Sequence, residues 1–149
     1  AIQKPAYGHE TRLGSRLYLM QGVHIPHDAL VEDDVVVTPM VAMGGMAKIL
    51  QGANIGMGAT IHQYGVVGQY SIVATGAAAT KNVRPFTRYI PGQAVSANAY
   101  AIEKFGFSAV REEIDAYVFN GAMPSDSQLI TIVQHYESFH ERSSRRQYD

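Results

Sequence analysis

Six histidines are the side chains of this 149-residue sequence best suited to proton transfer near neutral pH. They are His9, His24, His27, His62, His135 and His140. His27 is followed directly by Asp28, and a neutral histidine held in one tautomer by a carboxylate is the usual form of a general base. The pair therefore predicts a catalytic base at His27 that Asp28 supports. His135 and His140 lie near the end of the chain, where we expect them on the surface of a helix.

Apolar residues recur at every sixth position over the first half of the chain, which indicates a structural repeat. All twelve residues of this column are apolar, an outcome that chance would give roughly once in ten thousand sequences of this composition. The column is Leu13, Leu19, Ile25, Val31, Val37, Met43, Ile49, Ile55, Ile61, Val67, Val73 and Ala79. A second column, two residues earlier, is made mostly of small residues, as a tight interior position requires.

A period of six residues fits a short strand followed by a two-residue turn. Residue pairs suited to such turns are Gln21-Gly22, Asp33-Asp34, Gln51-Gly52, Thr75-Gly76 and Lys81-Asn82. Three strands make one triangular coil of 18 residues, so residues 11–84 hold about four coils, enough for a self-supporting stack. The repeat therefore predicts a parallel β-helix. An ordinary β-sandwich is the alternative, but its turns lie further apart.

The 18-residue coil places the candidate catalytic residues on one edge of the predicted prism. His27, Gly45 and Gln63 share a vertical column, and His62 stands beside Gln63. At ordinary strand separation these rungs span about 10 Å. A glycine turn one coil above the base can present a backbone N–H to a developing oxyanion. This arrangement predicts acyl transfer to a hydroxyl or an amine.

A zinc site is the competing interpretation of these edge histidines, because β-helical carbonic anhydrases bind zinc in this way. Such a site needs three histidines from two coils, and His24 and His27 are too close in sequence for that spacing. The absence of cysteine excludes a disulfide framework, a zinc-thiolate site and a cysteine nucleophile. We therefore predict no metal and no bound cofactor.

The composition excludes other classes of function. Twelve Lys and Arg residues against thirteen Asp and Glu residues leave a net charge of −1, which argues against a nucleic-acid binder. No apolar run approaches the ~18 residues that a membrane span needs, and no signal segment opens the sequence. We expect a cytoplasmic protein.

The second part of the sequence has helical patterning. We expect residues 1–92 to form the β-helix and residues 93–149 a helical region packed on it or on a neighbouring subunit, with residues 85–93 as a connecting loop. Ser108 is predicted to cap one helix that ends at Asn120-Gly121, and residues 125–128 resemble a capping box for the next. Residues 142–146 form a basic tail that we expect to be a solvated helix end.

Three segments carry a resemblance to a known enzyme family. They are Leu19–Asp28 with its His-x-x-His-Asp pattern, Ala53–Tyr64 ending in His-Gln-Tyr, and Lys104–Ser108. In this order they resemble the acyl-[acyl-carrier-protein]–UDP-N-acetylglucosamine O-acyltransferases of lipid A biosynthesis. The resemblance implies a left-handed β-helix of hexapeptide repeats followed by helices, and a homotrimer with its active site between subunits. That family has further coils upstream of the segment that begins here at Ala1, and the first coil's edge would be exposed unless residues 1–8 cap it.

The resemblance also implies roles for individual residues. His27 matches the general base, Asp28 its supporting carboxylate and Gly45 the oxyanion donor. The matched substrate-binding residues are His24, His62, Gln63, Thr75, Asn98 and Lys104, among which Thr75 corresponds to a position that sets acyl-chain length. The donor would be an acyl-carrier-protein or coenzyme A thioester, and the acceptor a nucleotide sugar or a similar molecule.

Departures from the family pattern leave a second hypothesis open. Met46 stands where the family has a histidine that grips the sugar nucleotide, Lys104 and Phe105 replace an arginine pair, and Tyr100 replaces an acidic residue. The alternative to an acyltransferase is therefore a non-catalytic trimeric β-helix that binds a nucleotide sugar or acts as a scaffold.

Overall fold

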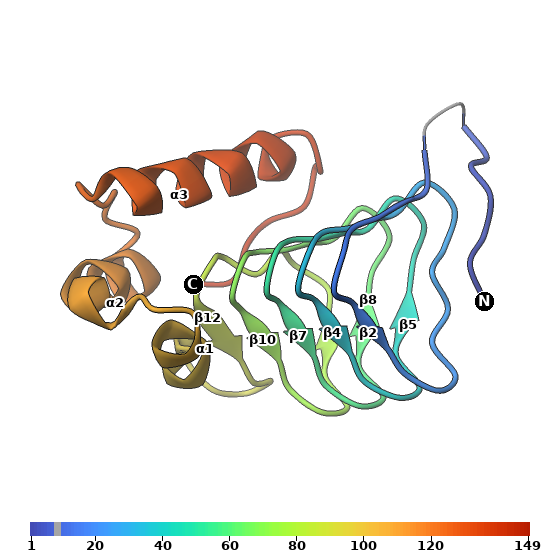
Figure 1. The fold of residues 1–149 in the computed structure, drawn as a ribbon, viewed down its shortest axis with the longest axis horizontal. Coiled ribbons are helices and arrows are strands. Elements are labelled where there is room, and N and C mark those ends of the chain that lie inside the picture. The colour runs from blue at the N-terminus through green and yellow to red at the C-terminus, as the bar shows by residue number, and fades with distance from the viewer. Residues whose placement is uncertain (8–9) are drawn as a thin grey trace.

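The structure, a computed structural model, describes residues 1–7 and 10–149. Its main element is the predicted left-handed parallel β-helix, whose coils lie side by side in Figure 1. Pairing between successive coils is offset by 18 residues, as in Val36 with Asn54 and Asn54 with Ile72. The period found in the sequence is therefore the period of the coil.

Parallel pairing stacks the strands into three faces, which we name by their number of strands. The four-strand face contains β1 (Arg12–Leu13), β3 (Leu30–Val31), β6 (Lys48–Ile49) and β9 (Val66–Val67). The six-strand face contains β2 (Tyr18–Leu19), β4 (Val36–Val37), β7 (Asn54–Ile55), β10 (Ile72–Val73), β12 (Thr87–Tyr89) and the antiparallel β13 (Ser96–Ala97). The three-strand face contains β5 (Ala42–Met43), β8 (Thr60–Ile61) and β11 (Ala78–Ala79).

Two-residue turns separate the faces, and we name each corner by one of its residues. The His27 corner joins the three-strand and four-strand faces and comprises residues 27–28, 45–46 and 63–64. The Gly52 corner comprises residues 33–34, 51–52 and 69–70, and the Gly76 corner residues 21–22, 39–40, 57–58 and 75–76. At each of these turns the second residue has a positive φ, which lies between 57° and 75°. The predicted turn at Lys81-Asn82 is wrong, because Asn82 is fully buried and forms a bridge with Gln147.

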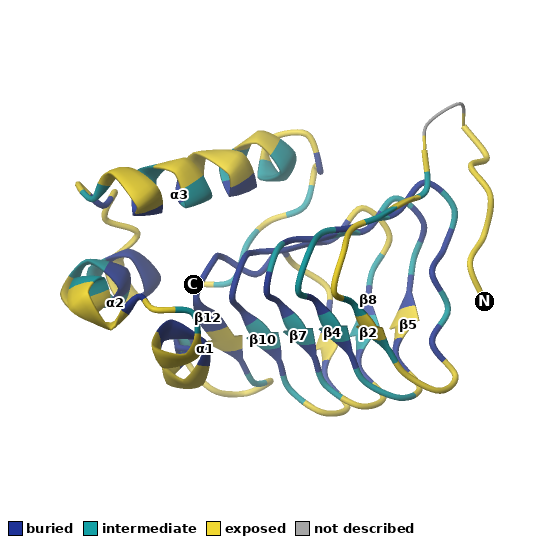
Figure 2. Cartoon of the chain, viewed as in Figure 1, coloured by how far each residue is buried: buried dark blue, intermediate teal, exposed yellow. Residues whose placement is uncertain are grey.

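The two apolar columns of the sequence form the interior of the prism. From Ile25 to Ala79 every residue of the first column is buried, and so are the small residues of the second column from Val23 to Ala77 (Figure 2). Burying a valine or isoleucine side chain contributes about 1.5–3 kcal/mol to stability. Small residues fill the second column because the acute interior leaves no room for larger ones.

The segment before the first complete coil covers its edge. Residues 1–3 run parallel to residues 23–25, with the Gln3 N–H donating to the Ile25 carbonyl at 2.8 Å and the Ile25 N–H donating to the Ala1 carbonyl at 2.7 Å. The expected cap is present over the described residues 1–7. His9 lies outside the described residues.

The helices follow the β-helix, and their bounds correct several predictions. They are α1 (Ala99–Lys104), the 3-10 helix η1 (Ser108–Val110), α2 (Arg111–Asn120) and α3 (Ser127–His140). Asn98 caps α1, Ser108 lies within η1 and caps nothing, and Asp126, not Ser125, caps α3 by accepting from the Leu129 N–H. The stop at Gly121, in the left-handed region with φ 70°, is confirmed.

The segments before and after the helices both pair with the β-helix, which the sequence did not predict. The predicted loop at residues 85–93 contains β12, so that prediction is wrong. Residues 143–149 return to the β-helix after α3 (Figure 1), and the Arg145 guanidinium donates to the Gln63 carbonyl at 2.6 Å and to the Thr80 carbonyl at 3.0 Å. The basic tail is thus a bound segment and not a solvated helix end.

Candidate active site

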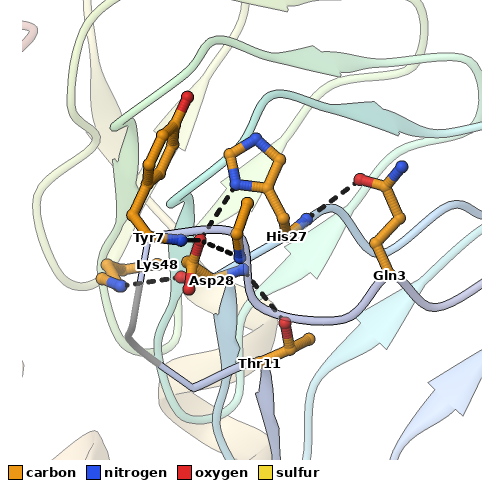
Figure 3. Close-up of polar contacts among 7 residues, drawn as sticks. Gln3, Tyr7, Thr11, His27, Asp28 and Lys48 are labelled. Atoms are coloured by element: carbon orange, nitrogen blue, oxygen red, sulfur yellow. Dashed lines mark hydrogen bonds and ion pairs between the residues drawn. The ribbon is translucent and has the colours of Figure 1, made fainter.

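His27 and Asp28 form a hydrogen-bonded pair at the first turn of the His27 corner. His27 Nδ1 lies 3.0 Å from Asp28 Oδ2 (Figure 3). The Asp28 side chain is fully buried, whereas the His27 side chain is 25% exposed. The carboxylate therefore holds one ring nitrogen from inside, which leaves Nε2 as the nitrogen available to exchange a proton with a substrate.

The carboxylate of Asp28 is held by the N-terminal segment. The backbone N–H groups of Ala6 and Tyr7 donate to Asp28 Oδ2 at 3.0 and 3.3 Å. Burial by itself raises the pKa of Asp28, but the hydrogen bonds from Ala6, His27 and Tyr7 together outweigh it and hold the pKa below its ordinary value. Asp28 is therefore an anion at neutral pH and fixes His27 as an Nδ1–H donor.

The turn that carries Asp28 is fixed by further contacts of its main chain. The Asp28 N–H donates to Thr11 Oγ1 at 3.0 Å, the Lys48 ammonium donates to the Asp28 carbonyl at 3.2 Å, and the His27 N–H donates to Gln3 Oε1 at 3.1 Å (Figure 3). The edge of the Tyr7 ring faces the His27 ring, with centroids 5.3 Å apart. These partners come from three segments, so the orientation of His27 depends on tertiary structure.

Gly45 lies one coil above His27, directly against its ring. A Cβ atom at Gly45 would lie 2.4 Å from both Cε1 and Nε2 of His27, closer than any real contact. Glycine is thus required here for the imidazole to occupy its place. The N–H of Gly45 has no hydrogen-bond acceptor among the residues that the structure describes. A free N–H beside the candidate base is suited to binding a developing oxyanion.

Gln63 continues the same column one coil further along, with His62 preceding it. The Tyr64 N–H donates to the Gly45 carbonyl at 3.1 Å, which fixes the two turns one above the other. The Gln63 carbonyl accepts from Arg145, while His62 and His24 flank the corner on the side of the three-strand face, each half-buried. The structure therefore brings His24, His27, Gly45, His62 and Gln63 to one edge.

Three predicted binding residues lie elsewhere in the single chain. Thr75 is on the Gly76 corner, across the three-strand face from His27. Asn98 is buried, accepting from the Ala101 N–H and donating to the Tyr70 carbonyl at 3.0 Å. Lys104 ends α1, its Nζ 5.4 Å from the centre of the Phe105 ring. These positions cannot join His27 within one prism.

The contacts of Ala6, Tyr7 and Thr11 with the catalytic pair were not predicted. The two backbone donors belong to a segment outside the repeat, so its register gives no signal for them. Thr11 belongs to the small-residue column, and its hydroxyl accepts from the Asp28 N–H. Because small residues are expected throughout that column, nothing in the sequence indicated this contact. The prediction that His140 is a surface residue is wrong, because its Nδ1 lies 2.8 Å from the amide nitrogen of the buried Asn82.

The described residues offer neither a clustered metal-ligand set nor a membrane-spanning helix. Over residues 1–7 and 10–149, no three His, Asp or Glu side chains gather as a metal site would require. Within the described part of the chain, no helix has the length and apolar character to span a bilayer.

Comparison with known proteins supports the motif assignment. No family model matches the chain. The chain is 27% identical over 153 residues to the acyl-[acyl-carrier-protein]–UDP-N-acetylglucosamine O-acyltransferase of Synechocystis sp. (strain ATCC 27184 / PCC 6803 / Kazusa), a match that covers 92% of this chain and 55% of that protein. The resemblance to this family is confirmed. The chain spans about half the length of the curated relative.

A solved structure shows the same architecture. The UDP-N-acetylglucosamine O-acyltransferase of Moraxella catarrhalis RH4 matches with a TM-score of 0.55 at 20% identity, over 99% of this chain and 64% of that one. This likeness confirms the fold, a left-handed β-helix of about four coils with a helical C-terminal segment.

Proposed function

We propose that this chain carries an acyltransferase site in which His27 is the general base and Gly45 the oxyanion donor. The donor is a phosphopantetheine thioester, on acyl carrier protein or coenzyme A. The acceptor is a hydroxyl or amine of a nucleotide sugar or a similar molecule. The observation that carries the proposal is the contact of the His27 ring, held by the ionised Asp28, with a glycine whose N–H is free among the described residues.

The reaction follows from these groups. His27 Nε2 takes the proton of the acceptor hydroxyl as its oxygen attacks the thioester carbonyl carbon. The carbonyl oxygen becomes an anion that accepts from the Gly45 N–H. Collapse of this intermediate forms the new ester and breaks the carbon–sulfur bond. The departing thiolate receives the proton held on His27, so the base returns to its neutral form.

Substrate contacts are assigned by position. His24, His62 and Gln63 lie beside the base on the same edge, where they can hold the acceptor and the donor arm. Only the family resemblance supports a binding role for Thr75, Asn98 and Lys104. Within one prism, Thr75 lies on a different corner from His27.

A homotrimer would complete the site. In a closed threefold assembly the Gly76 corner of one subunit can meet the His27 corner of the next, which places Thr75 opposite the base. On the three-strand face the exposed residues Ala42 and Ala78 are small, which permits this close approach. Light scattering should give three times the chain mass at micromolar concentration. A monomer there would contradict the intersubunit site.

The non-catalytic hypothesis has one specific observation in its favour. Met46, at the turn beside His27, stands where the similar enzymes have a histidine, so a contact to the sugar nucleotide is lost. A scaffold or binding protein would retain the fold and bind a nucleotide sugar without releasing thiol.

One experiment separates the two functions. The protein is incubated with acyl-carrier-protein and coenzyme A thioesters and a panel of UDP-sugars, and thiol release is followed with time. Thiol release that requires an acceptor and disappears in His27→Ala, but persists in the matched variant His135→Ala, supports the acyltransferase. Binding of a UDP-sugar by calorimetry without thiol release supports the scaffold.

A further inference from the structure

A groove of about 560 Å³ lies between the four-strand face and the helix α3, beside the His27 corner. Its apolar lining comes from Leu30, Met46, Val66 and Phe139. The groove is thus formed by the β-helix and a helix of the same chain. Its ligand would contact the four-strand face, whereas the histidines of the proposed active site flank the three-strand face.

Two cations face this groove without an anionic partner. Within residues 1–7 and 10–149 the Lys48 ammonium donates to the Asp28 carbonyl alone. Arg142 donates to the Ser138 carbonyl at 2.8 Å, and its guanidinium lies 5.3 Å from the centre of the Phe139 ring. Among the described residues, no carboxylate lies within ion-pair distance of either. Arg12 and Glu10 also line the groove, but they are paired with each other.

The electrostatics of Lys48 agree with this geometry. Burial lowers the pKa of Lys48 below its ordinary value, and although the Asp28 carboxylate opposes the shift, the nearby Arg142 adds to it. Two like charges at an apolar groove repel each other, and an anion between them would relieve this repulsion.

The two ends of the groove differ in charge. A second hollow of about 460 Å³ adjoins it beneath α3 and shares Arg12, Leu30 and Phe139 with it. The charge of Arg12 is balanced by its partner Glu10. The other charged residues of the far hollow are the carboxylates Glu32 and Asp33 with His135, which lies 2.7 Å from Glu32. An anionic head is therefore favoured only at the Lys48 end, with an apolar chain lying along Leu30 and Phe139.

We propose that this groove binds a fatty acid, with its carboxylate between Lys48 and Arg142 and its chain under α3. Charge complementarity selects the head, because charge-assisted hydrogen bonds are the strong ones. The apolar walls select a single alkyl chain over a bare anion. The site does not depend on acyl transfer and can be occupied whether or not the protein is an enzyme.

A unique fluorophore makes the binding measurable. The sequence contains no tryptophan, so Phe139→Trp places a single one in the groove wall. Dodecanoate, titrated below its critical micelle concentration, should change the tryptophan emission to saturation, and calorimetry on the unmodified protein should give the same affinity. Acetate and dodecyltrimethylammonium should bind at least tenfold more weakly, since each lacks one half of the recognised chemistry.

Variants locate the head group. Lys48→Met keeps the apolar stem and Arg142→Gln keeps polarity, and each should weaken dodecanoate binding about tenfold or more. Lys81→Met removes an exposed lysine outside the groove and should leave the affinity unchanged. Equal binding of the cationic amphiphile, no binding of dodecanoate, or unchanged affinity in both groove variants would overturn the proposal. A tryptophan signal that instead follows protein concentration and oligomer mass would assign the groove to a second copy of the chain.

Discussion

The His27 corner and the Gly76 corner have the same backbone and different residues. At the Gly76 corner the left-handed positions are Gly22, Met40, Gly58 and Gly76. At the His27 corner the corresponding positions are Asp28, Met46 and Tyr64, none of them glycine. A side chain in the left-handed region is disfavoured by about 1–2 kcal/mol per residue. The Gly76 corner thus mostly uses glycine, which adopts a positive φ without strain. The His27 corner carries side chains at these positions at a cost in stability.

The glycines of the two corners serve different purposes. A Cβ atom at Gly58 or Gly76 would meet nothing within 4 Å, so these glycines are there for their positive φ. Gly45 has no such φ, and its Cβ would collide with the His27 ring. Non-glycine residues with positive φ also occur at the Gly52 corner, at Asp34 and Tyr70, so what sets the His27 corner apart is a glycine that makes room for an imidazole ring. The comparison therefore points to the His27 corner as the place of chemistry.

Removing the imidazole should give the largest effect. His27→Ala should reduce thiol release by about 10²–10⁴-fold, because general-base assistance is lost. Folding should persist, since His27 is a partly exposed turn residue outside the apolar columns. His135→Ala, which removes an imidazole on α3, serves as the control and should retain full activity. Equal rates for the wild type and a folded His27→Ala protein would remove the catalytic assignment.

Replacing a glycine of each kind with alanine should affect rate in one case and stability in the other. Gly45→Ala should displace the His27 ring and lower the rate by about 10²-fold, the usual consequence of a misplacement near 1 Å. Gly92→Ala, which lies outside both corners and whose added Cβ would meet nothing within 4 Å, should leave the rate unchanged and lower stability by about 1–2 kcal/mol, because alanine is strained at φ 78°. Rates and thermal unfolding of both variants test this. A Gly45→Ala protein with wild-type rate would show that the close contact has no catalytic role.

Asp28→Asn should have a smaller effect on rate than His27→Ala, because the base remains and only its tautomer is perturbed. Its clearer consequence is the pH dependence of stability. The folded pKa of Asp28 is depressed, so the carboxylate stabilises the fold above the ordinary pKa of about 4, and this contribution disappears as the pH falls through the lower folded value. The difference in Tm between wild type and Asp28→Asn should therefore shrink as the pH is lowered below about 4. A constant difference down to the lowest pH would contradict an ionised Asp28.

The smallest effect concerns the one side chain that breaks the glycine pattern of the Gly76 corner. Met40 has φ 64° and is 64% exposed, so Met40→Gly relieves conformational strain at little loss of burial. Glycine in turn loses more backbone entropy on folding, which leaves a net stabilisation of less than about 1 kcal/mol. Denaturant unfolding should show a small rise in midpoint with unchanged activity. A clear destabilisation would mean that the contact of Met40 with Gly22 outweighs the strain.

The elements that the sequence predicted well are those fixed by the repeat. The apolar columns, most of the corner turns and the offset that places Gly45 above His27 all follow from a local period, because each strand and turn repeats the same geometry. The helix stop at Gly121 is equally local. The helix starts were less successful, since Asn98 caps a helix that was not expected and Ser108 caps none.

The sequence by itself determined the coil, its core and the adjacency of a histidine and an aspartate on one edge, since short-range spacing specifies each of them. The tertiary structure decided how that pair is held. The N–H groups of Ala6 and Tyr7 reach Asp28 across 22 and 21 residues, and Arg145 reaches the Gln63 carbonyl across 82 residues. These contacts come from segments without a period, whose path is set by how they pack back on the prism. No spacing rule along the chain encodes that path.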